Sequence, residues 1–182
     1  MRYVLPTILT ILLSGKTLAA TLYLSTTGLT YHAIPVNEEL AQQMPYRLTD
    51  NGRWVLHPRE TGINLFLPHS LHLTFISLHD CFDEEAQVYG VGNHWALNER
   101  VGVGYLAVLY SRKRHYFIDS DGARAYAADM PYTMTDGEHE YIPTAFATYS
   151  YQILNGKRWH LTFLFAGNVW LNHMMLSLGQ SL

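Results

Sequence analysis

The sequence predicts an all-β protein, an eight-stranded antiparallel up-and-down β-barrel. From Thr21 onward, apolar residues alternate with polar or small ones, and turn signals interrupt this pattern at intervals. No helical pattern is long enough to cover the face of a sheet, so the strands must bury their apolar sides against one another. A β-sandwich is the alternative, but eight segments of about 10 residues with short turns and one long loop favour the barrel. Residues 21–182 of the 182-residue chain are expected to form this single domain.

Residues 1–20 have the pattern of a signal peptide. Arg2 precedes an apolar run from Tyr3 to Ser14, which is shorter than the ~20 residues of a membrane-spanning helix. Small residues follow, and cleavage after Ala19 or Ala20 would release the chain. The alternative, a permanent N-terminal anchor, fits the short run less well. We expect the protein to be exported.

Eight strands are predicted in order. An Asn51-Gly52 turn precedes the second strand, which we expect to bend at Pro58 because proline has no N–H to donate. In the fourth and fifth strands glycine alternates with bulky residues, which suits an interior where backbones approach closely. Asn155-Gly156 is the clearest hairpin signal. The expected strands are residues 21–32, 54–67, 70–82, 87–97, 100–111, 144–154, 158–170 and 172–178.

Residues 112–141 separate the fifth strand from the sixth. This charged stretch contains Asp and Gly turn signals, and it predicts either a long loop or two strands that extend far beyond the barrel. Both alternatives place it outside the body of the domain.

The strand pattern favours a barrel in the outer membrane. Aromatic residues near the strand ends are expected to form two girdles at the membrane surfaces: Tyr23, Tyr31, Trp54, Trp95, Tyr110, Trp159 and Trp170. The alternative is that these side chains fill the core of a soluble barrel or sandwich. The C-terminal Leu182 is not aromatic, which leaves a periplasmic location open.

Composition excludes several classes of function. The formal net charge of −3 argues against a nucleic-acid-binding protein, which would carry a basic patch. One cysteine can form neither an internal disulfide nor a cysteine-rich zinc site, and the ten histidines are scattered without ligand spacing. Phosphate-binding, dinucleotide-binding and Gly-x-Ser-x-Gly motifs do not occur. We therefore expect no metal and no cofactor.

The densest cluster of reactive side chains in the sequence is His79, Asp80 and Cys81. A thiol is a nucleophile only as the thiolate, and a nearby imidazole can activate it. Side chains alternate along a strand, so Asp80 and Cys81 point to the same side only if the strand ends or bulges there, and the acidic turn that begins at Asp83 indicates an end. His32 closes the first strand. The structural alternatives are a small buried cysteine and a solvated histidine.

Several short segments occur in the order and approximate spacing of one known family. They are LTYHA (29–33), LHDCF (78–82), VYGVG (88–92) followed by Trp95, VGVGY (101–105) and YIP (141–143). Together they resemble the lipid A palmitoyltransferase (PagP) family of small outer-membrane barrels. The resemblance covers most of residues 21–182. It implies an eight-stranded barrel with an acyl-chain pocket, and a reaction that moves a palmitoyl chain from a phospholipid to lipid A.

The resemblance also implies roles for three residues. The family's histidine, aspartate and serine fall on His32, Asp80 and Cys81. His32 would act as general base or electrostatic partner, Asp80 would orient and polarise, and Cys81 would be nucleophile or hydrogen-bond donor. The chain departs from the family in having cysteine for serine, and in starting its strand pattern at Thr21, where the family has an amphipathic helix.

Two other functions remain open on the sequence. One is a non-enzymatic barrel of the same fold, a binding or structural protein whose 112–141 segment contacts a partner. The other is a soluble periplasmic lipid-binding barrel. A monomer is expected in each case, because no exposed edge pattern indicates assembly.

Overall fold

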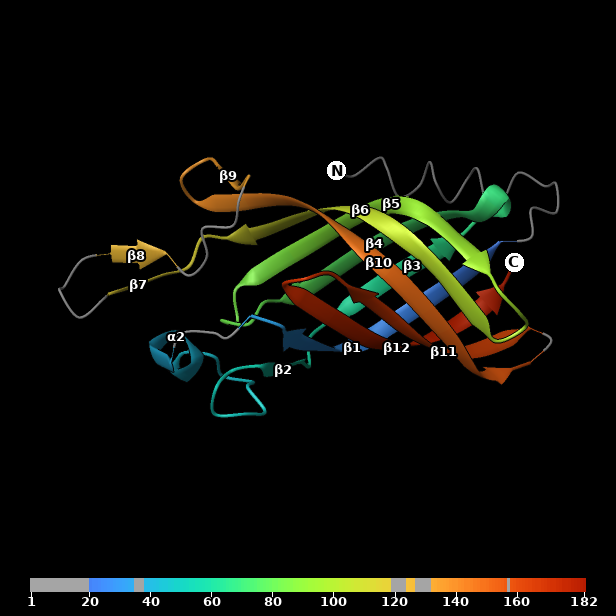
Figure 1. Ribbon diagram of the computed structural model, residues 1–182, viewed down its shortest axis with the longest axis horizontal. Coiled ribbons are helices and arrows are strands. Elements are labelled where there is room, and N and C mark those ends of the chain that lie inside the picture. The colour runs from blue at the N-terminus through green and yellow to red at the C-terminus, as the bar shows by residue number, and fades with distance from the viewer. Residues whose placement is uncertain (1–19, 35–37, 119–123, 127–131, 157) are drawn as a thin grey trace.

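A computed structural model describes residues 20–34, 38–118, 124–126, 132–156 and 158–182. These residues form a closed barrel of eight antiparallel strands (Figure 1), which confirms the predicted fold class. Each strand pairs with the next, and the last pairs with the first. The strands are β1 (Thr21–His32), β3 (Thr61–Phe66), β4 (Leu71–His79), β5 (Glu85–Ala96), β6 (Val101–Lys113), β10 (His139–Asn155), β11 (Trp159–Gly167) and β12 (Leu171–Ser181).

The predicted signal segment, residues 1–20, lies outside the described residues except for Ala20. Within the described part of the chain, no helix has the length and apolarity needed to cross a bilayer. The short helix α2 (Glu38–Gln42) and the 3-10 turn η1 (Pro68–Ser70) were not predicted.

The predicted second strand, residues 54–67, was wrong as one continuous strand. It is divided into β2 (Trp54–His57) and β3, with a turn that begins at Pro58. β2 pairs with the end of β1 from Gly28 to Tyr31, whereas β3 pairs with its beginning. The division coincides with a register shift between Ser25 and Gly28 in β1. Pro58 therefore ends a strand and does not merely bend one.

Residues 112–141 were predicted to form either a long loop or extended strands, and their described part contains extended strands. β6 continues to Lys113 and β10 begins at His139, so the two strands remain paired beyond the predicted ends. β9 (Met134–Thr135) adds to the edge of β10, and β7 (Tyr116–Ile118) pairs with β8 (Arg124–Tyr126) in a separate ladder. Figure 1 shows this ladder beyond the end of the barrel. Residues 119–123 and 127–131 lie outside the described residues.

The two ends of the barrel differ in what surrounds them. One end, here called the site end, carries α2, β2 and the β7–β8 ladder, and includes His32 and the turn after β4 (Figure 1). The opposite end, here called the far end, contains the two chain ends of β1 and β12 and short connections such as η1. Additional structure is therefore concentrated around one opening.

Side chains alternate between the interior and the outside, as predicted. On β5, Gly90, Gly92 and His94 face inward, opposite interior residues of β4 and β6. Gly102 of β6 is required by close approach, since a Cβ there would overlap the His94 ring. The glycine faces predicted from the sequence thus lie where side chains and backbones crowd the interior.

Two of the seven aromatics assigned to girdles were wrong. Tyr23 is only 4% exposed and belongs to the core cluster, and Tyr110 packs against that cluster and lines the interior cavity. Both stand at inward positions of their strands, so alternation overrides their position near a strand end. The aromatics exposed toward the far end are Trp95, Tyr105, Tyr149, Tyr151 and Trp159.

Candidate active site

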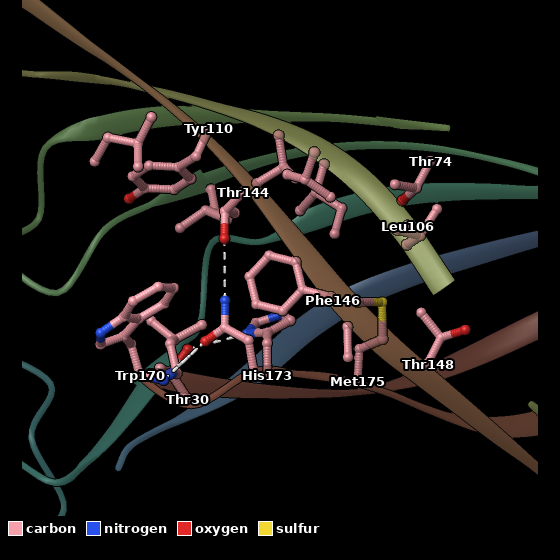
Figure 2. Close-up of a pocket in the computed structure, with 18 of the residues that line it drawn as sticks. Thr30, Thr74, Leu106, Tyr110, Thr144, Phe146, Thr148, Trp170, His173 and Met175 are labelled. Atoms are coloured by element: carbon pink, nitrogen blue, oxygen red, sulfur yellow. Dashed lines mark hydrogen bonds between the residues drawn. The ribbon is translucent and has the colours of Figure 1, made fainter. Parts of the chain in front are cut away.

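The site-end half of the barrel interior is hollow. It holds a cavity of about 620 Å³, with walls built largely from aliphatic and aromatic side chains. Figure 2 shows Tyr110, Trp170 and Thr30 on one side of Phe146, and Thr74, Leu106 and Thr148 on the other. The three residues selected from the sequence, His32, Asp80 and Cys81, all line this cavity.

His32 and Cys81 are direct neighbours although 49 residues separate them in the sequence. His32 Nε2 lies 3.1 Å from Cys81 Sγ. His32 is the last residue of β1, and Cys81 follows the end of β4, so the barrel brings two strand ends together at one rim. A histidine and a thiol in contact at the mouth of an apolar cavity can exchange or share a proton.

Asp80 organises the turn that presents the thiol. β4 ends at His79, as the sequence indicated, and Asp80 Oδ1 accepts hydrogen bonds from the backbone N–H of Phe82 and Glu84 at 2.8 and 3.1 Å. Asp83 completes the turn with a positive φ of 65°. Strand pairing has ended, so Asp80 and Cys81 both line the cavity. The described hydrogen bonds of Asp80 include none to His32.

A buried ion cluster on β6 and β10 supports this turn. Arg112 lies between two carboxylates, 3.3 Å from Asp80 Oδ2 and 2.9 Å from Glu140 Oε2, and all three side chains are at most 8% exposed. Arg114 makes a further contact with Glu140 at 3.3 Å. Buried charges of this kind are stable only when paired, so the cluster ties β4, β6 and β10 together.

The thiol is held in its protonated form. Burial raises the pKa of the Cys81 thiol to about 12; the negative charge of Asp80 adds to the rise and Arg112 opposes it. When Nε2 of the neutral His32 ring is unprotonated, it can accept the S–H of this thiol. The pair at neutral pH is a thiol and a neutral imidazole, not a thiolate and an imidazolium.

The cavity reaches the outside of the barrel between β10 and β11. Their pairing begins at Ala147 and Gly167, so residues 142–146 of β10 have no strand partner on that edge within the described chain. Asn168 bridges part of the interval by donating to Thr144 Oγ1 at 3.1 Å. The outward-facing Pro143 and Ala145 also line the cavity. The wall is therefore thin at this position.

The far-end half of the interior is filled by polar side chains. His94 Nε2 lies 2.9 Å from Ser150 Oγ, and His160 Nε2 lies 2.7 Å from Ser181 Oγ. Gln152 donates to the Tyr23 hydroxyl at 3.3 Å. Most of these side chains are outside the cavity lining, so the far end forms its floor.

The sequence interpretation missed most of the residues that surround the site. Arg112 and Glu140 fell in the stretch assigned to a loop or extended strands, although continuing the alternation of the fifth strand from Tyr110 would have placed Arg112 inward. His57, Glu60 and His173 carried no motif and come together only in the folded barrel. Among the described residues, no group of three His, Cys, Asp or Glu is placed to hold a metal ion.

Comparisons with known proteins add no family assignment. No model of a protein family matches the chain, and no curated protein matches it in sequence.

Proposed function

We propose that the protein is an outer-membrane acyltransferase that moves an acyl chain from a phospholipid to lipid A. The observation that carries the proposal is the combination of an apolar cavity of about 620 Å³ with the His32–Cys81 pair at its mouth. This volume falls within the range of small-molecule sites, roughly 300 to 1,000 Å³. The resemblance to lipid A palmitoyltransferases supplies the substrate classes.

The outer surface supports a membrane location. Exposed aliphatic side chains around the barrel include Leu24, Val91, Leu176 and Leu178, each about half exposed. Outward-facing Ser77, Gln87 and Ser111 are paired in one row across three strands near the site end. An apolar band that ends at a polar row is the surface expected of a membrane barrel.

The thin wall between β10 and β11 supports entry of a lipid chain from the side. An acyl chain in the membrane could pass the unpaired edge at residues 142–146 and extend into the cavity with its ester at the rim. The chain would pass from one apolar environment to another, so it would not have to cross water on the way to the site.

The protonated thiol favours direct transfer to the acceptor. In the proposed reaction the Cys81 S–H turns from His32 to the ester carbonyl oxygen, and the freed Nε2 accepts the proton of a lipid A hydroxyl. The acceptor oxygen bonds to the carbonyl carbon, the bond to the glycerol oxygen breaks, and His32 returns its proton to that oxygen. One ester is consumed and one is formed, without a thioester.

Mass spectrometry of lipid A tests the proposal. Cells that produce the wild-type protein should show lipid A with one added acyl mass, and cells without it should not. His32→Ala should abolish the addition, whereas Cys81→Ala should reduce it about 100-fold through loss of one hydrogen-bond donor. Cys81→Ser should retain activity. His69→Asn, which alters an exposed histidine away from the cavity, is the matched control. No added mass in any strain would refute an acyltransferase.

A lipid-binding barrel without enzymatic activity is the second candidate. It is favoured by the raised thiol pKa and by Asp80, whose described hydrogen bonds go to Arg112 and the turn and not to His32. It predicts that phospholipid binds in the cavity while lipid A stays unchanged. Release of the protein without detergent would in addition favour the periplasm over the outer membrane.

A further inference from the structure

A second polar cluster lies in the wall of the same cavity and has no part in the proposed reaction. Thr30 Oγ1 is 2.8 Å from His57 Nε2 and 3.0 Å from His173 Nδ1. On the other side of the His173 ring, Nε2 lies 2.8 Å from Glu60 Oε2. Glu60, His57 and Thr30 are 1–3% exposed, and His173 is 9% exposed. Thr30, His57 and His173 line the cavity.

The fold leaves room for this cluster. Gly28 of β1 faces it, and a Cβ at that position would overlap both the Glu60 carboxylate and the His173 ring. Glu60 lies in the turn between β2 and β3, where the register of β1 also shifts. Space for one buried carboxylate in the barrel wall is therefore provided by Gly28, by the register shift in β1 and by the break between β2 and β3.

The hydrogen bonds of His57 have a definite direction. Its Nδ1 lies 2.8 Å from the His79 carbonyl oxygen, which can only accept, so Nδ1 carries a proton. In the neutral ring Nε2 is then an acceptor, and the Thr30 hydroxyl donates to it. His57 is therefore placed as a base for the Thr30 proton.

His173 and Glu60 complete the arrangement from the other side. The Thr30 hydroxyl donates to His57, so its oxygen accepts from His173 Nδ1–H. Glu60 Oε2 lies beside His173 Nε2, and neither oxygen of Glu60 has a hydrogen bond to another described residue. The His173 ring therefore stands between a buried carboxylate and the Thr30 hydroxyl, with Nδ1 3.0 Å from Oγ1. The carboxylate orients the ring, and the N–H donated to Oγ1 stabilises that oxygen as it loses its proton.

We propose that Thr30 is a nucleophile that accepts an acyl group from an ester whose chain occupies the cavity. His57 acts as its base, and the His173–Glu60 pair polarises it. Oγ1 bonds to the carbonyl carbon as its proton passes to His57 Nε2; the ester bond then breaks, and His57 gives that proton to the departing alcohol or phenol oxygen. The products are an acyl-threonine and a free hydroxyl compound, with His57 neutral again.

Two observations distinguish Thr30 from Cys81 as the acylated residue. Cys81 contacts one neutral imidazole, whereas Thr30 contacts two imidazoles, one of which has a carboxylate partner. The thiol is also held protonated by burial. The inference goes beyond the proposed transfer to lipid A, since a covalent acyl-enzyme needs no lipid A.

Acylation by p-nitrophenyl palmitate in detergent micelles tests the assignment. The purified wild-type protein should release p-nitrophenolate and gain one palmitoyl mass, mapped by peptide mass spectrometry to Thr30. Thr30→Ser should still be labelled. Thr30→Val should not, and Glu60→Gln should be labelled about 100-fold more slowly. Circular dichroism confirms that each variant is folded.

His69→Asn, which alters an exposed histidine away from the cavity, is the matched control. It should retain labelling of Thr30 at the wild-type rate. A palmitoyl group on Cys81 in the wild type, or no covalent label while the folded protein binds the ester, would overturn the assignment. Because the assay contains neither phospholipid nor lipid A, its outcome is separate from that of the proposed transfer reaction.

Discussion

The two halves of the barrel interior are built from the same eight strands but are used differently. Toward the far end, polar side chains from strands that are not neighbours meet in the interior, as in the His94–Ser150 and Gln152–Tyr23 pairs. Toward the site end the interior is a cavity lined largely by aliphatic and aromatic side chains, and its polar groups include the rim residues and the Thr30 cluster. The same alternation of residues thus produces a filled half and a hollow half.

The difference shows what an open interior requires. Packed cores are dense, and a cavity forfeits contact energy, so the hollow half needs other connections between its strands. The Arg112 cluster provides one of these, because it links three strands at the rim through buried ion pairs. We infer that side-chain packing in the far half stabilises the barrel, whereas the site half has less packing and contains space for a ligand.

The largest expected effect concerns the reactivity of Cys81. The native thiol has a pKa of about 12, so its thiolate fraction at pH 8 should be about a thousandfold below that of the unfolded chain. Alkylation by iodoacetamide, followed by mass spectrometry, should therefore be slow at pH 8 and rise about tenfold per pH unit through pH 10. The urea-unfolded protein is the control, and its rate should level off near pH 9. A native rate that levels off below pH 8 would show a thiolate.

The next largest effect is on stability at the rim. Arg112→Met removes the ion-pair partner of the buried Asp80 and leaves Glu140 with Arg114 alone, and should lower the free energy of unfolding by about 3 kcal/mol. Denaturant unfolding followed by tryptophan fluorescence measures it. Arg59→Met removes an exposed pair with Asp83 and should change stability by less than about 0.5 kcal/mol. Equal losses of stability in the two variants would show that the buried cluster at the rim does not stabilise the fold.

A smaller loss is expected from adding one methyl group to the filled half. In Gly102→Ala the new Cβ would overlap His94 and lie 2.8 Å from Ser150 Oγ, so the packed side chains must move. Overpacking of this kind costs about 1–3 kcal/mol. The same unfolding measurement tests it, and an unchanged midpoint would show that the far half is not tightly packed.

The smallest stability change is expected from a much larger addition to the hollow half. Ala166 lines the cavity and is partly exposed within the barrel. In Ala166→Phe the ring enters existing space, so the free energy of unfolding should change by less than about 1 kcal/mol. If Ala166→Phe lowered the free energy of unfolding more than Gly102→Ala, the site half would be the more tightly packed of the two, contrary to our inference.

Much of the barrel was predictable because alternation depends only on neighbouring residues. The predicted bounds of the first strand agree with β1, and the end of β4 before Asp80 followed from the acidic turn. The contact between His32 and Cys81 came from the resemblance, not from spacing. The cavity and the Glu60–His173 pair were out of reach, because they depend on which residues meet across the barrel. Tyr23 and Tyr110 were misassigned because position near a strand end was weighed above alternation.

We propose that the hollow half performs acyl transfer and that the filled half supports it. The most direct test follows a labelled palmitoyl chain from phospholipid to lipid A with purified protein in detergent micelles. The wild type and Ser150→Ala, which alters the filled half, should transfer the label, whereas folded Ala166→Phe should not. Equal transfer by the wild type and Ala166→Phe, or no transfer by the folded wild type, would contradict acyl transfer in the hollow half.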